Sequence, residues 1–140
     1  MEKISKDNRF VATIENINYG SFNSEGVTVC NITAVMRFRS KVIDKLHIVT
    51  IARSVESTQD YDVEYGKTLA RAKAEMKMYE SIKEKITNAI LNNATTKDFN
   101  NDKAIKDAII MMNTIQFCNK MIKHQITYIN KLIRNKFPNE

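Results

Sequence analysis

Between residues 105 and 133, apolar side chains return in alternating steps of three and four, the spacing of one face of an amphipathic helix. The first apolar row of this helix consists of Ile105, Ala108, Met112, Ile115, Asn119, Ile122, Ile126, Ile129 and Ile133, with asparagine as its one polar member. The second apolar row, beside it, consists of Met111, Cys118, Met121, Tyr128 and Leu132. The pattern predicts a helix over about residues 100–136.

The two rows cover more of this helix than one core requires. Together they widen the apolar arc to roughly 200°, whereas a surface helix needs an arc of about 100°. The helix would be about 50 Å long, while three strands spaced ~4.8 Å apart span only about 15 Å. The excess apolar surface predicts a partner helix, most simply from a second copy of the chain in a two-fold homodimer or a higher homo-oligomer.

The N-terminal part of the sequence is typical of an antiparallel β-meander with three strands. Residues 10–19, 27–38 and 46–54 are rich in β-branched and aromatic side chains. Residues 20–26 supply the glycine, serine and asparagine of a turn. Both faces of the second strand carry apolar residues, so we expect helices over one face and consider a second subunit for the other.

An acidic segment, Asp60-Tyr61-Asp62-Val63-Glu64, marks the start of a helix over about residues 61–92. Asp60 or Asp62 is the expected N-cap, and capping explains these carboxylates without a bound cation. A short polar connection before residue 100 makes the two helices an antiparallel hairpin. The fold is therefore predicted as one α+β domain over residues 1–140, a three-stranded antiparallel β-meander at about 10–54 followed by a long two-helix hairpin.

The net charge of +6 is unevenly placed, because no acidic residue lies between Asp107 and Glu140. Cations near the end of the last helix complement its dipole, which accounts for Arg134 and its neighbours. Lys120 and Lys123 lie too far from that end for this explanation. They indicate an anionic partner, with phosphate the commonest candidate.

Residues that common catalytic and metal sites need are missing from the sequence. Glycine occurs only at positions 20, 26 and 66, which excludes the glycine-rich loops of phosphate-binding enzymes. No serine or cysteine has a base that the sequence identifies, and the two histidines lack further zinc ligands nearby. We therefore expect a protein that is not an enzyme, with no catalytic residues, no metal and no cofactor.

The expected compartment is the cytoplasm. No apolar run approaches the ~20 residues of a membrane span, and the first residues lead into no signal-peptide core. Cys30 and Cys118 are expected to be buried, reduced thiols. A soluble protein without a membrane partner follows.

Six residues are candidates for binding a nucleotide. Guanidinium and ammonium groups suit phosphates, while amides and an aromatic ring near the hairpin tip suit a purine. The candidates are Arg71, Asn92, Asn93, Phe99, Arg134 and Lys136. An antiparallel hairpin places the arginines at one end and the asparagines at the other, so one pocket would contain both groups only if a second subunit contributed.

The order of features resembles that of the phage-encoded Thoeris anti-defense family. The resemblance rests on a short β-meander, the entry Asp60-Tyr61-Asp62-Val63-Glu64-Tyr65-Gly66-Lys67, and two long helices that complete a chain of this length. It implies a cytoplasmic protein of the host bacterial cell that binds a cyclic ADP-ribose isomer without cleaving it, in paired pockets of a homodimer. It also implies further assembly and separate pockets for other cyclic nucleotides.

Such a protein would withhold the signalling nucleotide from a bacterial immune effector. The alternative is an anti-CRISPR-like protein or another nucleic-acid-binding blocker that acts through a basic helix face. Nucleic acid is the less favoured partner, because Phe and Tyr fall mostly on the apolar rows and not among the basic residues.

Overall fold

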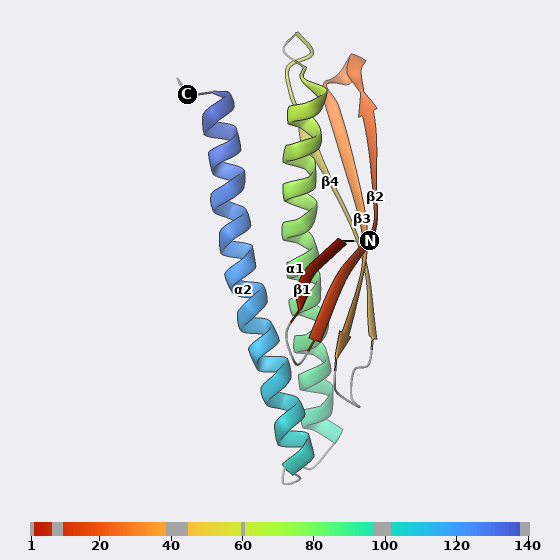
Figure 1. Ribbon diagram of the computed structural model, residues 1–140, viewed down its shortest axis with the longest axis vertical. Helices are drawn as coiled ribbons and strands as arrows, with labels where there is room; N and C mark the ends of the chain where they lie inside the picture. Colours follow the sequence, from red (N-terminus) through yellow and green to blue (C-terminus); the bar gives the residue numbers. More distant parts are fainter. Residues whose placement is uncertain (1, 7–9, 39–44, 60, 97–101, 138–140) are drawn as a thin grey trace.

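The computed structural model describes residues 2–6, 10–38, 45–59, 61–96 and 102–137 (Figure 1). Its elements are β1 (Glu2–Lys6), β2 (Phe10–Phe22), a 3-10 turn (Asn23–Glu25), β3 (Val27–Phe38), β4 (Lys45–Val55), α1 (Val63–Thr96) and α2 (Asp102–Lys136). The two helices run in opposite directions beside the sheet. The predicted α+β architecture, a meander followed by a helix hairpin, is confirmed.

The sheet has one strand more than the sequence predicted. Its order is β1-β2-β3-β4, and each strand is antiparallel to the next. The three predicted strands correspond to β2, β3 and β4, whereas β1 has a single apolar residue, Ile4, and shows no alternation. Its position comes from pairing with β2, where Glu2 lies opposite Ile14 and Lys6 opposite Val11.

α1 begins at a capped N-terminus that packs closely on the sheet. Asp62 Oδ1 accepts hydrogen bonds from the backbone N–H groups of Glu64 and Tyr65, at 3.1 and 3.3 Å. Asp62 is therefore the N-cap, one of the two predicted positions, while Asp60 lies outside the described residues. A Cβ added at Gly66 would overlap the hydroxyl of Thr28 on β3, so the helix approaches the strand at van der Waals distance here.

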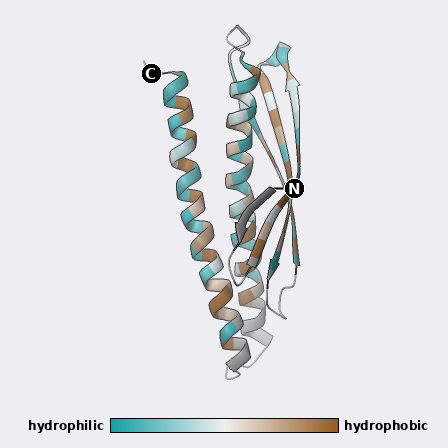
Figure 2. Cartoon of the chain, viewed as in Figure 1, coloured by the Kyte–Doolittle hydropathy of each residue, from teal (hydrophilic) through white to brown (hydrophobic). Residues whose placement is uncertain are grey.

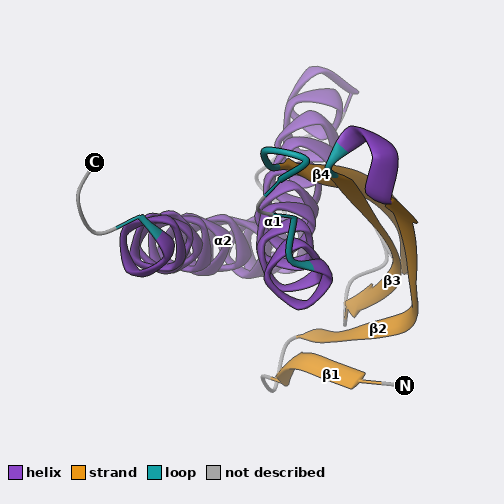
Figure 3. Ribbon diagram, turned by 90° about the horizontal axis from the view of Figure 1, so that it is seen from above, coloured by secondary structure: helices purple, strands orange, loops and turns teal. Residues whose placement is uncertain are grey.

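α1 lies between the sheet and α2, and Figure 3 shows the strands curving around one side of it. It packs on β3 and β4 through Ala70, Ala74, Met78 and Ile82, all fully buried. The small alanines let the helix approach so closely that Thr50 Oγ1 of β4 donates to the carbonyl of Ala74 at 2.9 Å. The inward side chains of β3 complete this core: Cys30, Ile32, Ala34 and Met36.

α2 turns its second apolar row toward α1 and leaves much of its first apolar row exposed. Met111 and Cys118 of the second row are 2% and 0% exposed. In the first row Met112 and Ile126 are 55% and 46% exposed, and Ile129 alone is buried, at 8%. Apolar positions recur along α2 in Figure 2, and several of them form apolar surface that the described part of the chain does not cover.

Candidate functional site

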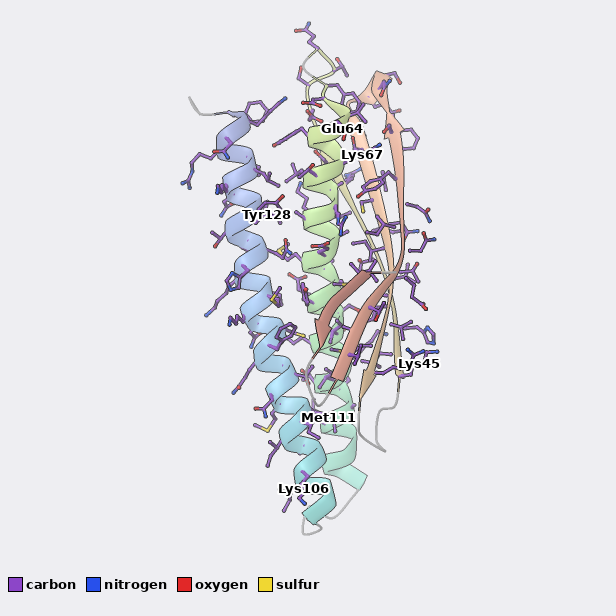
Figure 4. All side chains as sticks on the ribbon, viewed as in Figure 1. Lys45, Glu64, Lys67, Lys106, Met111 and Tyr128 are labelled. Atoms are coloured by element: carbon purple, nitrogen blue, oxygen red, sulfur yellow. The ribbon has the colours of Figure 1, made fainter. Side chains whose placement is uncertain are left out.

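A pocket of about 640 Å³ lies where the first turns of α1, the end of β2 and α2 meet. Figure 4 shows Glu64 and Lys67 on the first turns of α1 and Tyr128 on the facing part of α2. We call it the tyrosine pocket, and its lining is Tyr19, Glu64, Lys67, Thr68, Arg71, Ala72, Glu75 and Tyr128.

Helical spacing and a strand irregularity bring these side chains together. Lys67, Arg71 and Glu75 follow one another at intervals of four residues and therefore share a face of α1. On β2, the pairing with β3 shifts between Ile14 and Asn16, so the inward alternation moves by one residue. Tyr19 consequently lies opposite the buried Cys30, on the side of the sheet that α1 covers, where its ring stays partly exposed.

A network of charged and amide groups forms one wall of the pocket. Arg71 Nε donates to Glu75 Oε1 at 2.9 Å, and Gln125 Nε2 of α2 donates to Glu75 Oε2 at 3.1 Å. The ammonium of Lys67 lies 5.5 Å from the centroid of the Tyr19 ring, within cation–π range. Burial raises the pKa of Tyr19, while the adjacent Arg71 acts in the opposite direction. This wall thus contains two cations, Lys67 and Arg71, and the carboxylate of Glu75, which accepts hydrogen bonds from side chains of both helices.

This arrangement suits a ligand that joins a flat ring to an anionic group. Tyr19 and Tyr128 are 40% and 45% exposed, so both rings are accessible for stacking. Arg71 and Lys67 supply donors for a phosphate on the same side. The second carboxylate of the lining, Glu64, lies at the exposed rim, where it can accept a hydrogen bond from a ribose hydroxyl.

Three of the sequence-predicted binding residues lie in the half of the hairpin that contains this pocket. Arg71 lines it. Arg134 is exposed near the end of α2, outside the lining. Lys136 reaches Asp62 Oδ2 at 3.4 Å and lies 5.1 Å from the centroid of the Tyr65 ring, so it joins the end of α2 to the start of α1.

The other three predicted residues lie elsewhere. Asn92 and Asn93 belong to the last turns of α1, about 30 Å along the helix from Arg71 at 1.5 Å per residue. Phe99 lies outside the described residues. One chain therefore does not bring the predicted amides to the predicted arginine, and whether a second chain does so stays a prediction.

Both tyrosines of the pocket lie outside the set of binding residues predicted from the sequence. The sequence pattern places Tyr128 in the second apolar row and Tyr19 in the first predicted strand. A signal for Tyr128 was present, because its hydroxyl is unusual in a row that is otherwise aliphatic or sulfur-containing. No local signal exists for Tyr19, since its direction depends on the register shift.

A second, shallower pocket of about 540 Å³ lies on α2 itself. It is lined by Lys120, Lys123, His124, Thr127, Tyr128 and Lys131. Its cations repeat along one exposed face without a carboxylate among them, as expected from the distribution of charge in the sequence. This basic face shares Tyr128 with the tyrosine pocket.

Other kinds of site find little support in the described part of the chain. Among those residues, no three His, Cys, Asp or Glu side chains gather as a metal site would require. Burial raises the pKa of Cys30 to about 11 and that of Cys118 to about 12, so neither thiol is an activated nucleophile. Neither helix, as far as it is described, combines the length and apolar character of a bilayer-crossing segment.

Comparison with known proteins assigns none of these surfaces. No protein-family model, curated protein or solved structure matches the chain. The chemistry of the tyrosine pocket is therefore the main guide to function.

Proposed function

We propose that this protein binds and sequesters a cyclic ADP-ribose isomer without cleaving it. The observation that carries the proposal is the tyrosine pocket, which combines two accessible rings with a guanidinium and an ammonium group. A tyrosine ring stacks on adenine, and an arginine binds two phosphate oxygens at once. The pocket volume also lies in the range that small ligands occupy in proteins.

The hydrogen bonds of Glu75 and the raised pKa values of the two thiols support binding of the ligand without turnover. Glu75 already accepts hydrogen bonds from Arg71 and Gln125, so its role is to hold the wall of the pocket. The raised thiol pKa values of Cys30 and Cys118 disfavour nucleophilic attack. A stoichiometric binder of this kind would lower the free concentration of a signalling nucleotide and keep a bacterial immune effector inactive, the anti-defense role that the sequence resemblance implies.

Ligand depletion and recovery test this proposal. The protein is mixed with cyclic ADP-ribose isomers, the free nucleotide is measured by chromatography after filtration, and the protein is then heated. Depletion by about one ligand per pocket, followed by recovery of the intact nucleotide, is the expected result. Recovery of ADP-ribose in excess over protein would show that the protein is an enzyme and would refute sequestration.

Substitutions decide where the nucleotide binds. Arg71→Ala and Tyr128→Ala should each weaken binding measured by calorimetry, the arginine change by ~1.5–3 kcal/mol, the usual value for a hydrogen bond to a charged group. Arg134→Ala and Asn92→Ala test the pocket that was predicted between two chains. Loss of affinity in the first pair alone assigns the ligand to the tyrosine pocket of one chain, whereas loss in all four assigns it to a pocket that two chains share.

The basic face of α2 supports a second candidate function, binding to nucleic acid. Lys120, Lys123 and Lys131 surround an accessible tyrosine ring, a combination that binds single strands through phosphate contacts and stacking. Fluorescence anisotropy with a labelled oligonucleotide tests it over a range of salt concentrations. Affinity that falls steeply with salt and is lost in Lys120→Glu/Lys123→Glu would favour this candidate over nucleotide sequestration.

A further inference from the structure

β4 is the last strand of the sheet, and among the residues that the structure describes no strand pairs with its outer edge. Alternate residues of this strand direct their backbone groups away from β3, where the carbonyls of Ile51 and Arg53 accept hydrogen bonds from Lys77 and Lys73 of α1, at 3.1 and 3.4 Å. Ile51 and Val49 are also 55% and 62% exposed on the outer face of the sheet. A strand of 11 residues with exposed apolar side chains and an open backbone edge is suited to pairing with another strand.

The face of α1 beside this edge carries charges that are complementary to those of a second, antiparallel copy of the same face. Lys73, Lys77, Glu80 and Glu84 follow one another in steps of four, three and four, so they lie on one side of the helix. The last three are exposed, and Lys73 is half-buried. Two cations thus precede two anions, symmetrically about the midpoint between Met78 and Tyr79. In an antiparallel pair of such helices, every lysine would face a glutamate.

One two-fold axis can serve both the strand edge and the helix face. The hydrogen bonds from Thr50 to the carbonyl of Ala74 and from Lys77 to the carbonyl of Ile51 show which part of α1 lies beside the middle of β4. Along the helix axis, this part lies within about one turn, 5.4 Å, of the charge midpoint between Met78 and Tyr79. Because α1 packs on both β3 and β4, it lies over the space between them. With strands ~4.8 Å apart, two copies of α1 would be about 10 Å apart, a normal helix packing distance.

We propose that a second copy of this chain pairs along β4, antiparallel, to give one continuous sheet with the two α1 helices side by side. Lys73 and Lys77 then release the carbonyls of β4 to the N–H groups of the added strand. They bind the partner's Glu84 and the partner's Glu80 instead. In the register centred on Ile51, Arg53 faces the partner's Val49, so no two cations oppose each other across the strands. This interface lies apart from the tyrosine pocket and does not depend on its ligand.

A charge exchange on α1 tests the helix half of the interface. Lys77→Glu places carboxylates together at two symmetric positions, and the double variant Lys77→Glu/Glu80→Lys restores opposite charges at both. Sedimentation velocity at micromolar concentration should give the mass of two chains for the unmodified protein and the double variant. Lys77→Glu should raise the dissociation constant at least tenfold. Lys120→Glu, with the same charge change on α2, should leave the dimer intact.

A lysine on β4 tests the strand half. Ile51→Lys places two ammonium groups opposite each other at the two-fold axis and should also give single chains. Val55→Lys is its matched control, because Val55 is similarly exposed, at 62%, but lies at the end of the strand. Circular dichroism confirms folding of each variant. A single-chain mass for the unmodified protein, a dimer that survives Lys77→Glu or Ile51→Lys, or a double variant that stays dissociated overturns the proposal.

Discussion

Replacing Gly66 with alanine tests the contact that seats α1 on the sheet. The new Cβ would overlap the hydroxyl of Thr28, lie 3.0 Å from the Cβ of Thr28 and lie 3.1 Å from Glu56 Oε2. Thr28 is fully buried and Glu56 is 9% exposed, so neither side chain can turn into solvent. The helix or the strand must therefore shift, although alanine suits a helical backbone better than glycine does.

The magnitude follows from three opposing terms. Alanine in place of glycine stabilises a helix by about 1 kcal/mol. Overpacking of one carbon in a tight site costs about 1–3 kcal/mol. Displacement of the Thr28 hydroxyl also weakens its 2.6 Å hydrogen bond to the hydroxyl of Tyr61, worth about 1 kcal/mol. The steric and hydrogen-bond terms outweigh the helical gain, and we expect a net loss of about 2 kcal/mol.

Urea unfolding followed by circular dichroism measures this loss. The midpoint for Gly66→Ala should fall with the slope unchanged. Gly20→Ala is the control, because among the described residues a Cβ there would meet only the ring of Phe22, at 3.6 Å. Adding Thr28→Ala to Gly66→Ala should cost less than the two single changes together, since both act on one contact. A Gly66→Ala protein as stable as the unmodified one would refute the reasoning.

Two further predictions concern the thiols and the exposed row of α2. The thiols of Cys30 and Cys118 should react with Ellman's reagent only as the protein unfolds. Burial raises their pKa to about 11 and about 12, so above about pH 9 only the unfolded protein loses these protons. The free energy of unfolding should therefore fall as pH rises above about 9. Ile129→Asp should destabilise the protein by about 3 kcal/mol or more in urea unfolding, because that side chain is 8% exposed. In a single chain Ile126→Asp, at 46% exposed, should cost less than about 1 kcal/mol, whereas an equal cost at both positions would support the partner helix predicted from the sequence.

Local patterns were sufficient for most of the fold. Periods of two and of three to four residues located three strands and both helices, because each pattern reports the side that an element buries. β1 escaped because its place depends on pairing with β2 and not on its own residues. The sequence also did not predict which apolar row of α2 packs on α1. Met111 and Met112 are equally apolar, and only the packing of α2 on α1 buries the first, at 2%, and exposes the second, at 55%.

The candidate site was predictable only where one helix carries it. The charge and chemistry of Arg71 predict it as a binding residue, and it lines the tyrosine pocket. Tyr19 joins that pocket from β2, far away in the sequence, and a strand irregularity sets its direction. Contacts of this kind depend on register and packing, which the period of a single segment does not encode. The contributions of Asn92 and Phe99 remain predictions.

The contacts at the end of the chain change how α2 behaves mechanically. Lys136 binds Asp62 and lies over Tyr65, and the ring of Phe137 meets Tyr65 edge-on with 6.4 Å between centroids. In a helix hairpin that is joined only at its connection, the free end of the second helix moves most. These contacts also hold the C-terminal end of α2 against α1. They restrict the distance between α1 and Tyr128, which lies about two turns before Lys136. Ile129, next to Tyr128, also packs on Leu69 and Ala72 of α1. The opening of the tyrosine pocket therefore depends on this packing together with the contacts at the end of α2.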